Sequence, residues 1–253
     1  MTSASALRIE IEHALERRFP SALTPVPRTI RETAATGIAA VDALLEGGLP
    51  VGAISEVVGQ QSSGRTSLTL SFLAHRTQEG QVAAWVDAGD AFDPESAAAN
   101  GVSLRQLLWV RCRDGNAAAK NKPWARLDQA IRATDLLLQA GGFAAIVMDM
   151  GGTAPEHASR IPLATWFRFR QAADRSRCCL VVLGESAYAQ SSAALVVECA
   201  ARQAKTAGET VLTGFSFEVR REQQRMLTNV QGIRKPPAST WSATCGWAQE
   251  ERA

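Results

Sequence analysis

Residues 57–67, VVGQQSSGRTS, have the spacing of a phosphate-binding loop. Gly59 and Gly64 stand five positions apart, and Arg65 and Thr66 follow them. In such a loop, backbone N–H groups hold the phosphates of a nucleotide, a basic side chain reaches the terminal phosphates, and a hydroxyl helps to hold magnesium. Nucleotide-hydrolysing proteins place lysine at the basic position, whereas this chain has arginine. The spacing therefore predicts a phosphate site and leaves its activity open.

A second candidate ligand is Asp149, which closes the apolar run FAAIVMD. An acid at the end of a buried strand, together with a hydroxyl of the phosphate loop, is a common arrangement for magnesium. The predicted nucleotide site consists of Gly59, Gly64, Arg65, Thr66 and Asp149, with Thr66 and Asp149 as the metal ligands if magnesium binds. The alternative role of Asp149 is a helix cap or turn residue.

These residues need a sheet that brings the ends of its strands to one edge. From Thr36 onward, short β-type runs alternate with helical patterns, which predicts βαβ units and a mostly parallel sheet with helices on both faces. The runs FAAIVM and CCLVVL are apolar throughout, as is typical of central strands that are covered on both faces. The runs ALVVECAAR and FSFEVRREQ predict an antiparallel edge at the C-terminal side.

The domain organisation follows from composition and periodicity. The chain has 253 residues, of which 46% are apolar, enough for one large core with appendages. We expect an N-terminal helix and linker at 1–35, a core domain at 36–225 and a mobile tail at 226–253. Within the first part, residues 4–19 have the pattern of an amphipathic helix, which Pro20 ends. The tail has neither a helical nor a strand period.

The sequence also bears on the cellular compartment. It has no apolar run of the length that a membrane-spanning helix needs, and its start is charged and amphipathic, unlike a signal peptide. The five cysteines form no C-x-x-C pair and have no histidine nearby, so neither a disulfide framework nor a zinc site is supported. We expect a cytoplasmic protein with reduced, mostly buried thiols.

Charge is unevenly distributed, although the net charge is only +2. Residues 36–100 hold 2 basic and 8 acidic side chains, and residues 101–177 hold 12 and 6. A basic surface on the second segment would suit a polyanion such as DNA. The candidate DNA-binding residues are Lys120, Lys122 and Arg126. The alternative is a solvated basic face whose tryptophans pack inward.

The stretch from Thr36 to about Gly101 resembles the RecA-like ATPases, and within them the ImuA type of RecA-related protein from bacterial mutagenesis cassettes. The resemblance depends on the combination of TGIAAVDALLEGGLP, the phosphate loop and VDAGDAFDP, and it continues more weakly to about Arg221. It implies a RecA-like α/β fold. It also implies a non-polymerase accessory role in damage-induced (SOS) mutagenic translesion DNA synthesis.

Four positions depart from the RecA pattern. Recombinases have a glutamate that activates the attacking water where this chain has Gly89, beside Asp90. Loss of a positioned base costs roughly 10²- to 10⁴-fold in rate. Arg65 replaces lysine, Ser96 replaces the aromatic residue that packs on adenine, and Glu185 replaces the glutamine that senses the terminal phosphate. We therefore expect ATP hydrolysis to be absent or very slow and no cofactor to be required, with bound ATP and magnesium as the alternative.

The two segments with which RecA proteins grip DNA are short in this chain. GGTAPEHASRIP follows the Asp149 strand, and SAYAQSS, which has no lysine or arginine, follows the CCLVVL strand. A short loop without cations releases few counterions, so we do not expect strong filament-type DNA binding. The alternative functions are a weak DNA-binding protein and a slow DNA-stimulated ATPase in which Arg65 and Asp90 substitute for the missing groups.

The resemblance implies that the protein acts through protein contacts. The implied partners are an ImuB-type polymerase-like scaffold, the error-prone polymerase subunit and RecA, which would place the protein at the nucleoid when DNA is damaged. The candidate partner-binding residues are Leu7, Ile11 and Leu15 on the N-terminal helix, which in RecA joins protomers, and Trp241 and Trp247 in the tail. An edge contact on the core is the alternative for the two tryptophans.

Overall fold

The computed structural model describes residues 32–113, 125–207, 211–224 and 238–244, all of which belong to one compact unit. The main sheet consists of β3 (Ala53–Val58), β4 (Ala83–Asp87), β5 (Leu107–Arg111), β6 (Ala145–Asp149), β7 (Cys179–Gly184), β8 (Ala193–Ala207), β9 (Val211–Gln224) and β10 (Ala238–Thr244). A small antiparallel sheet joins β1 (Thr33–Ala34) and β2 (Leu49–Pro50). The helices are α2 (Ala39–Leu44), α3 (Arg65–Gln78), α4 (Pro94–Ala99), α5 (Ala125–Ala140), α6 (Pro155–Ala158) and α7 (Leu163–Ser176), with 3₁₀ turns η1 (Leu104–Gln106) and η2 (Gln190–Ser192).

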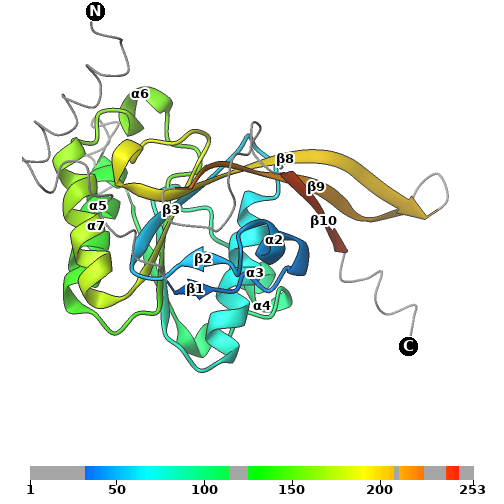
Figure 1. Ribbon diagram of the computed structural model, residues 1–253, viewed down its shortest axis with the longest axis horizontal. Helices are drawn as coiled ribbons and strands as arrows, with labels where there is room; N and C mark the ends of the chain where they lie inside the picture. Colours follow the sequence, from blue (N-terminus) through cyan, green and yellow to red (C-terminus); the bar gives the residue numbers. More distant parts are fainter. Residues whose placement is uncertain (1–31, 114–124, 208–210, 225–237, 245–253) are drawn as a thin grey trace, which may run out of the picture. The chain divides into compact units, whose positions relative to one another are not determined.

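The main sheet is mostly parallel, with an antiparallel C-terminal side. Its strand order is β10-β9-β8-β3-β7-β6-β4-β5 (Figure 1). The pairs from β5 across to β8 are parallel, and the pairs β8–β9 and β9–β10 are antiparallel. The predicted fold class, a mostly parallel sheet with helices on both faces and an antiparallel edge, is confirmed.

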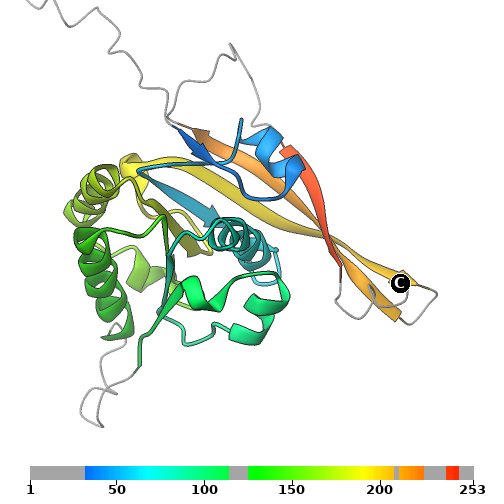
Figure 2. The same cartoon turned by 90° about the horizontal axis from the view of Figure 1, so that it is seen from below.

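Helices cover the two faces of the parallel strands (Figure 2). The sheet thus divides the hydrophobic core into two layers, one on each face. Side chains alternate along each strand, so Trp85 and Val147 face one layer, which includes α2, α3 and α4. Val86 and Ile146 face the other layer, which includes α5 and α7. All four side chains are fully buried. The two-sided burial explains why these strands are apolar throughout.

The prediction of a mobile tail at 226–253 is wrong for Ala238–Thr244, which form β10 and pair with β9 in an antiparallel register. Trp241 of β10 lies opposite Phe217 of β9, and their ring centroids are 4.8 Å apart. Trp241 is 9% exposed. It is therefore an edge contact on the core and not a free partner anchor. A short run of serine, threonine and alanine has no clear strand period, and pairing with β9 gives it its structure.

The antiparallel strands also run further than the sequence predicts. β8 has 15 residues and β9 has 14, and together they form a long hairpin (Figures 1 and 2). The cysteines at positions 112, 178, 179 and 199 are free and buried, in agreement with the prediction for thiols in the described part of the chain. No helix among the described residues is long and apolar enough to cross a membrane.

Candidate functional site

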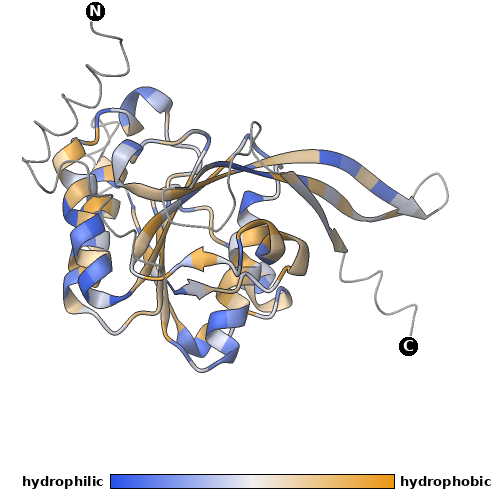
Figure 3. Cartoon of the chain, viewed as in Figure 1, coloured by the Kyte–Doolittle hydropathy of each residue, from blue (hydrophilic) through white to orange (hydrophobic). Residues whose placement is uncertain are grey.

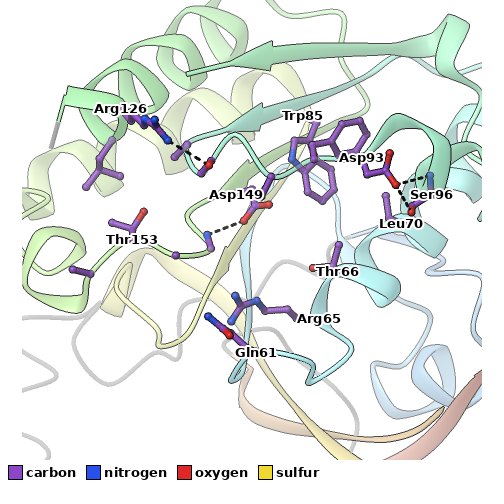
Figure 4. A pocket seen from close by; sticks show the side chains of 18 of the residues that line it. Gln61, Arg65, Thr66, Leu70, Trp85, Asp93, Ser96, Arg126, Asp149 and Thr153 are labelled. Atoms are coloured by element: carbon purple, nitrogen blue, oxygen red, sulfur yellow. Dashed lines mark hydrogen bonds between the residues drawn. The ribbon is translucent and has the colours of Figure 1, made fainter. Parts of the chain in front are cut away.

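A cavity of about 750 Å³ lies at the carboxyl ends of β4 and β6, beside the start of α3 (Figure 4). Its lining includes Arg65, Thr66 and Asp149, so the structure brings together the three side chains that the motif analysis selected. Ligands of open α/β sheets bind at this end of the strands. The apolar part of the lining includes Trp85 and Phe92.

The phosphate loop connects β3 to α3 and is closely packed by its surroundings. Gly64 is the N-cap of α3 and has a φ of 88°, which favours glycine. A Cβ atom at Gly64 would lie 2.6 Å from the ring of Phe217 on β9. A Cβ atom at Gly59 would lie 2.4 Å from the carbonyl oxygen of Cys199 on β8. Both predicted glycines are therefore required by the way the loop packs on the antiparallel strands.

Arg65 does not extend freely into the cavity. Its Nη1 atom donates hydrogen bonds to the carbonyl oxygens of Gly59 and Gly184, the latter at 3.1 Å. The residue is 9% exposed. In Figure 4 its guanidinium group lies between Gln61 and Asp149. The guanidinium group thus ties the phosphate loop to the end of β7, a use that its several N–H donors allow and a single lysine ammonium would reproduce less well.

Asp149 ends β6 and lines the cavity, and one of its carboxylate oxygens accepts a hydrogen bond from the backbone. Its Oδ1 atom accepts a hydrogen bond from the Gly151 N–H at 2.8 Å. Burial raises the pKa of Asp149 to about 6 and the charge of Asp87 adds to this, whereas the Gly151 N–H and the Arg65 charge lower it. Near neutral pH the carboxylate is therefore mostly ionised but retains a protonated fraction.

Gly89, which by the resemblance stands where recombinases have a glutamate, is closely packed against the segment that follows β6. A Cβ atom at Gly89 would lie 2.8 Å from the carbonyl oxygen of Gly151, on the segment that follows β6. Such a contact with backbone cannot be relieved by rotating a side chain. The absence of a carboxylate at this position is thus built into the local packing of the two segments.

Asp90, the neighbouring acid, is held by another group. It has a φ of 55° and accepts a hydrogen bond from Arg111 Nε at 2.6 Å. Arg111 lowers the pKa of Asp90, mainly through this hydrogen bond. A lowered pKa makes a carboxylate a weaker base, and Asp90 is not among the cavity-lining residues. The arrangement opposes the hypothesis that Asp90 replaces the missing base.

Asp87 is a second strand-end acid near the cavity, and the sequence analysis did not single it out. It is fully buried at the end of β4 and accepts hydrogen bonds from the N–H groups of Ala91 and Phe92, at 3.1 and 2.9 Å. It also accepts one from Trp109 Nε1 at 3.3 Å. Asp87 therefore shapes the loop that forms one wall of the cavity. The signal was present in the sequence, because Asp87 directly follows an apolar run, the same pattern that selected Asp149.

Asp93 and Ser96, at the positions that the resemblance assigns to the adenine side, form a helix cap. Asp93 is the N-cap of α4 and accepts hydrogen bonds from the N–H groups of Glu95 and Ser96. Ser96 Oγ also donates to Asp93 Oδ2 at 2.5 Å (Figure 4). Ser96 lines the cavity, and its hydroxyl is engaged within the chain. Glu185 directly follows β7 and is not among the lining residues.

The segment after β7 is pinned to the sheet. Glu56, which is buried in β3, accepts hydrogen bonds from the N–H groups of Tyr188 and Ala189, at 2.6 and 3.0 Å. Burial raises the pKa of Glu56, and these two N–H groups partly offset the increase. The segment after β7 is therefore short and hydrogen-bonded to β3 through Glu56.

Of the remaining predicted site residues, one lines the cavity and the others are outside the described residues. Arg126, a candidate for DNA contact, is among the residues that line the cavity, and its Nη1 atom donates a hydrogen bond to the Gly89 carbonyl oxygen at 3.5 Å (Figure 4). The other candidates for DNA or partner contact lie outside the described residues. These are Lys120, Lys122, Leu7, Ile11, Leu15 and Trp247.

The site fits a magnesium nucleotide only in part. Thr66 and Asp149 line the same cavity and offer oxygen ligands that suit magnesium. The basic side chain that should face the terminal phosphate hydrogen-bonds protein carbonyls instead, and the carboxylates in the lining are Asp93 and Asp149. Within the described residues, no group of three or more His, Cys, Asp or Glu is arranged to hold a metal ion. The cavity therefore holds two candidate magnesium ligands, while the basic side chain of the phosphate loop is engaged by the protein itself.

The parallel sheet, the phosphate loop at its edge and the strand-end acid define a P-loop α/β protein. The profile of the RecA N-terminal domain family matches residues 10–154, more than half of the chain, and the chain therefore belongs to the RecA family. This result confirms the RecA-like part of the resemblance.

The chain is similar to Protein RecA of several bacteria. Identity is 34% over 161 residues to that of Synechocystis sp., covering 61% of this chain and 44% of the relative. It is 32% over 169 residues to that of Allorhizobium ampelinum, covering 61% and 43%. The chain thus spans less than half the length of these curated relatives. The crystal structure of the RadB recombinase shares the fold, with a TM-score of 0.57, 15% identity, and coverage of 82% of this chain and 94% of that one.

Proposed function

We propose that this RecA-family chain is a non-polymerase accessory protein of damage-induced (SOS) mutagenic translesion DNA synthesis, of the ImuA type, and that it acts through protein contacts. Gly89 is the observation that supports this most strongly. The position that holds the lytic base in recombinases is a glycine here, and a Cβ atom at Gly89 would lie 2.8 Å from the Gly151 carbonyl oxygen. A recombinase scaffold without a positioned base suits binding rather than turnover, and fold alone does not preserve an activity.

Two further features support a role without hydrolysis. The Arg65 guanidinium group is bonded to the carbonyls of Gly59 and Gly184, where a phosphate-contacting lysine would extend into the cavity. The short loop after β7 is hydrogen-bonded to Glu56 and has no lysine or arginine, which supports a role that does not depend on gripping DNA. Both changes remove a function of RecA while leaving the scaffold intact.

The proposed partners are an ImuB-type polymerase-like scaffold, the error-prone polymerase subunit and RecA. The amphipathic pattern at residues 4–19 supports a docking helix. Deletion of residues 1–30 should weaken binding to at least one of these partners, measured by calorimetric titration of purified proteins. Unchanged affinity for all three would remove the helix from the proposal.

The decisive test of the site is titration of the purified protein with a fluorescent ATP analogue and magnesium, together with phosphate release in the presence and absence of single-stranded DNA. A RecA protein assayed under the same conditions is the positive control. We expect weak or absent binding and no turnover above background. Tight binding with DNA-stimulated turnover would refute the non-hydrolysing role.

The second candidate function is a slow DNA-stimulated ATPase. The observation that favours it is the placement of Thr66 and Asp149 in one cavity large enough for a nucleotide. If this function is correct, turnover should be measurable and should collapse when Thr66→Ala and Asp149→Ala are combined. Partner binding that survives the same double substitution is the result expected for the accessory role.

A further inference from the structure

We propose that the outer half of the β8–β9 hairpin is a docking surface for an extended, acidic segment of a partner protein. We name this surface the distal arm and define it as residues 199–206 of β8 and 211–217 of β9. The inference rests on the proposed function in one respect, because it requires the chain to work through protein contacts. It adds the surface and the chemistry of the segment that binds there.

The distal arm extends beyond the strand that supports the rest of β8. β3 pairs with one edge of β8, and the last pair is Val58 with Glu198. From Cys199 onward no strand in the described part of the chain pairs with this edge, whereas β9 continues along the other edge (Figures 1 and 2). An open edge presents backbone N–H and C=O groups that can pair with an extended segment.

The side chains of the outer part of β8 are exposed on both faces of the arm. Residues 201–206 are exposed at every position, so neither of the two alternating faces is covered. Figure 3 shows hydrophilic bands along this part of β8. Within the described residues β10 pairs with β9 only as far as Gly214, so the end of the arm beyond that pair is a two-stranded hairpin, which is marginally stable by itself. A partner segment along the edge would supply contacts that the arm lacks.

An apolar side chain on the distal arm offers an anchor. Phe215 is 42% exposed and continues the aromatic row that begins in the core, with its ring centroid 6.1 Å from that of Phe217. Its cross-strand neighbours are Ala204 on β8 and Ala243 on β10. Because both neighbours are small, the sides of the Phe215 ring are accessible. A large apolar side chain of a partner could pack beside it.

The distal arm has a cationic surplus, which selects the charge of the segment. Glu218 at the base of the arm binds two arginines, Arg202 and Arg220, so one carboxylate is shared between two positive charges. Lys205 Nζ donates to the neutral Ser242 Oγ at 2.7 Å and has no carboxylate in that contact. An acidic segment would compensate these charges, which favours association and orients the encounter.

A second copy of this chain is a less suitable occupant. Between residues 199 and 217 the sequence has one acid, Glu209, which is outside the described residues. Edge-to-edge pairing of two copies would therefore bring Arg202 and Lys205 of one copy close to those of the other. Cations on an edge strand, and a bulge such as the register shift between Ala201 and Gln203, are devices that oppose self-pairing. The same cations attract a segment of opposite charge.

The test is calorimetric titration of the full chain with the purified ImuB-type scaffold, the polymerase subunit and RecA. The variants are Phe215→Ser, which removes the anchor, and Lys205→Glu, which reverses a charge at an exposed position. The control is Leu136→Ser on α5, where an apolar residue that is 68% exposed is changed to the same polar residue. We expect each arm variant to weaken binding of at least one partner by about tenfold or more, as for an interface anchor, and the control to match the wild type.

Hydrogen exchange provides a second readout. In the complex, amides of residues 200–206 should exchange more slowly than in the free protein, whereas those of α5 should not change. If the wild type binds a partner and both arm variants bind it equally well, the arm is not the docking surface and the proposed function still stands. Failure of the wild type to bind any of the three partners overturns both. Self-association of the chain that Phe215→Ser abolishes would also overturn the inference, in favour of a second copy.

Discussion

Replacing Arg65 with alanine should destabilise the protein, because Arg65 holds the phosphate loop through charged hydrogen bonds. Its Nη1 atom donates to the carbonyls of Gly59 and Gly184, and the residue is 9% exposed. Each hydrogen bond to a charged group is worth about 1.5–3 kcal/mol. In the variant the Gly184 carbonyl keeps one partner, the Gly59 N–H at 3.2 Å. Two such bonds sum to about 3–6 kcal/mol, and because one carbonyl keeps a partner we expect a loss at the low end, about 3 kcal/mol.

For a chain of this size, such a loss corresponds to a Tm decrease of about 6–12 °C. The assay is thermal unfolding by circular dichroism, with urea unfolding as a check on the free energy. Arg65→Lys keeps the charge but not the planar group, so its Tm should lie between those of the wild type and Arg65→Ala. The control is Arg132→Ala, whose partner Asp128 is also exposed, and it should stay within about 0.5 kcal/mol of the wild type. An Arg65→Ala variant that melts with the wild type would refute the role of the guanidinium group.

Three other predictions concern the site and the edge of the sheet. Gly89→Glu should not create ATPase activity, because its Cβ would lie 2.8 Å from the Gly151 carbonyl oxygen, and phosphate release above background would contradict this. Burial raises the pKa of Asp149 from 3.8 to about 6, so the folded state binds this proton more tightly than the unfolded state and loses stability as the pH rises from about 4 to 6. A pKa shift of this size corresponds to about 3 kcal/mol of unfolding free energy, and Asp149→Asn should remove this pH-dependent loss. The measurement is urea unfolding across the same pH range. A variant with the pH profile of the wild type would count against the burial argument. Trp241→Ala should cost about 3 kcal/mol through lost packing on Phe217, and an unaltered urea midpoint would show that Trp241 is not part of the core.

The parallel part of the fold could be predicted because its signals are local. Strands such as β6 and β7 are buried on both faces, and this condition produces uninterrupted apolar runs that are visible in the sequence. Helices such as α3 begin directly after glycines that the loop requires. The order of these elements along the chain then restricts the sheet to βαβ units.

The antiparallel side could be predicted only in part. β10 consists of small polar residues around Trp241, and its strand conformation comes from pairing with β9. The outer part of the β8–β9 hairpin has little burial on either face, so its sequence lacks the alternation of apolar and polar residues from which a strand's length is predicted. Both elements depend on pairing with another strand, and the local pattern of apolar and polar residues does not report that pairing.

The sequence by itself determined which groups are present at the candidate site: the glycine spacing, the exchange of lysine for Arg65, the strand-end Asp149 and the loss of the glutamate at Gly89. The tertiary structure decided what those groups do. The Gly184 carbonyl comes from a strand that follows Arg65 by 119 positions, and Arg111, which engages Asp90, follows it by 21. Motif spacing reports neighbours along the chain, whereas the direction of a guanidinium group and the basicity of a carboxylate depend on packing between segments that the fold alone brings together.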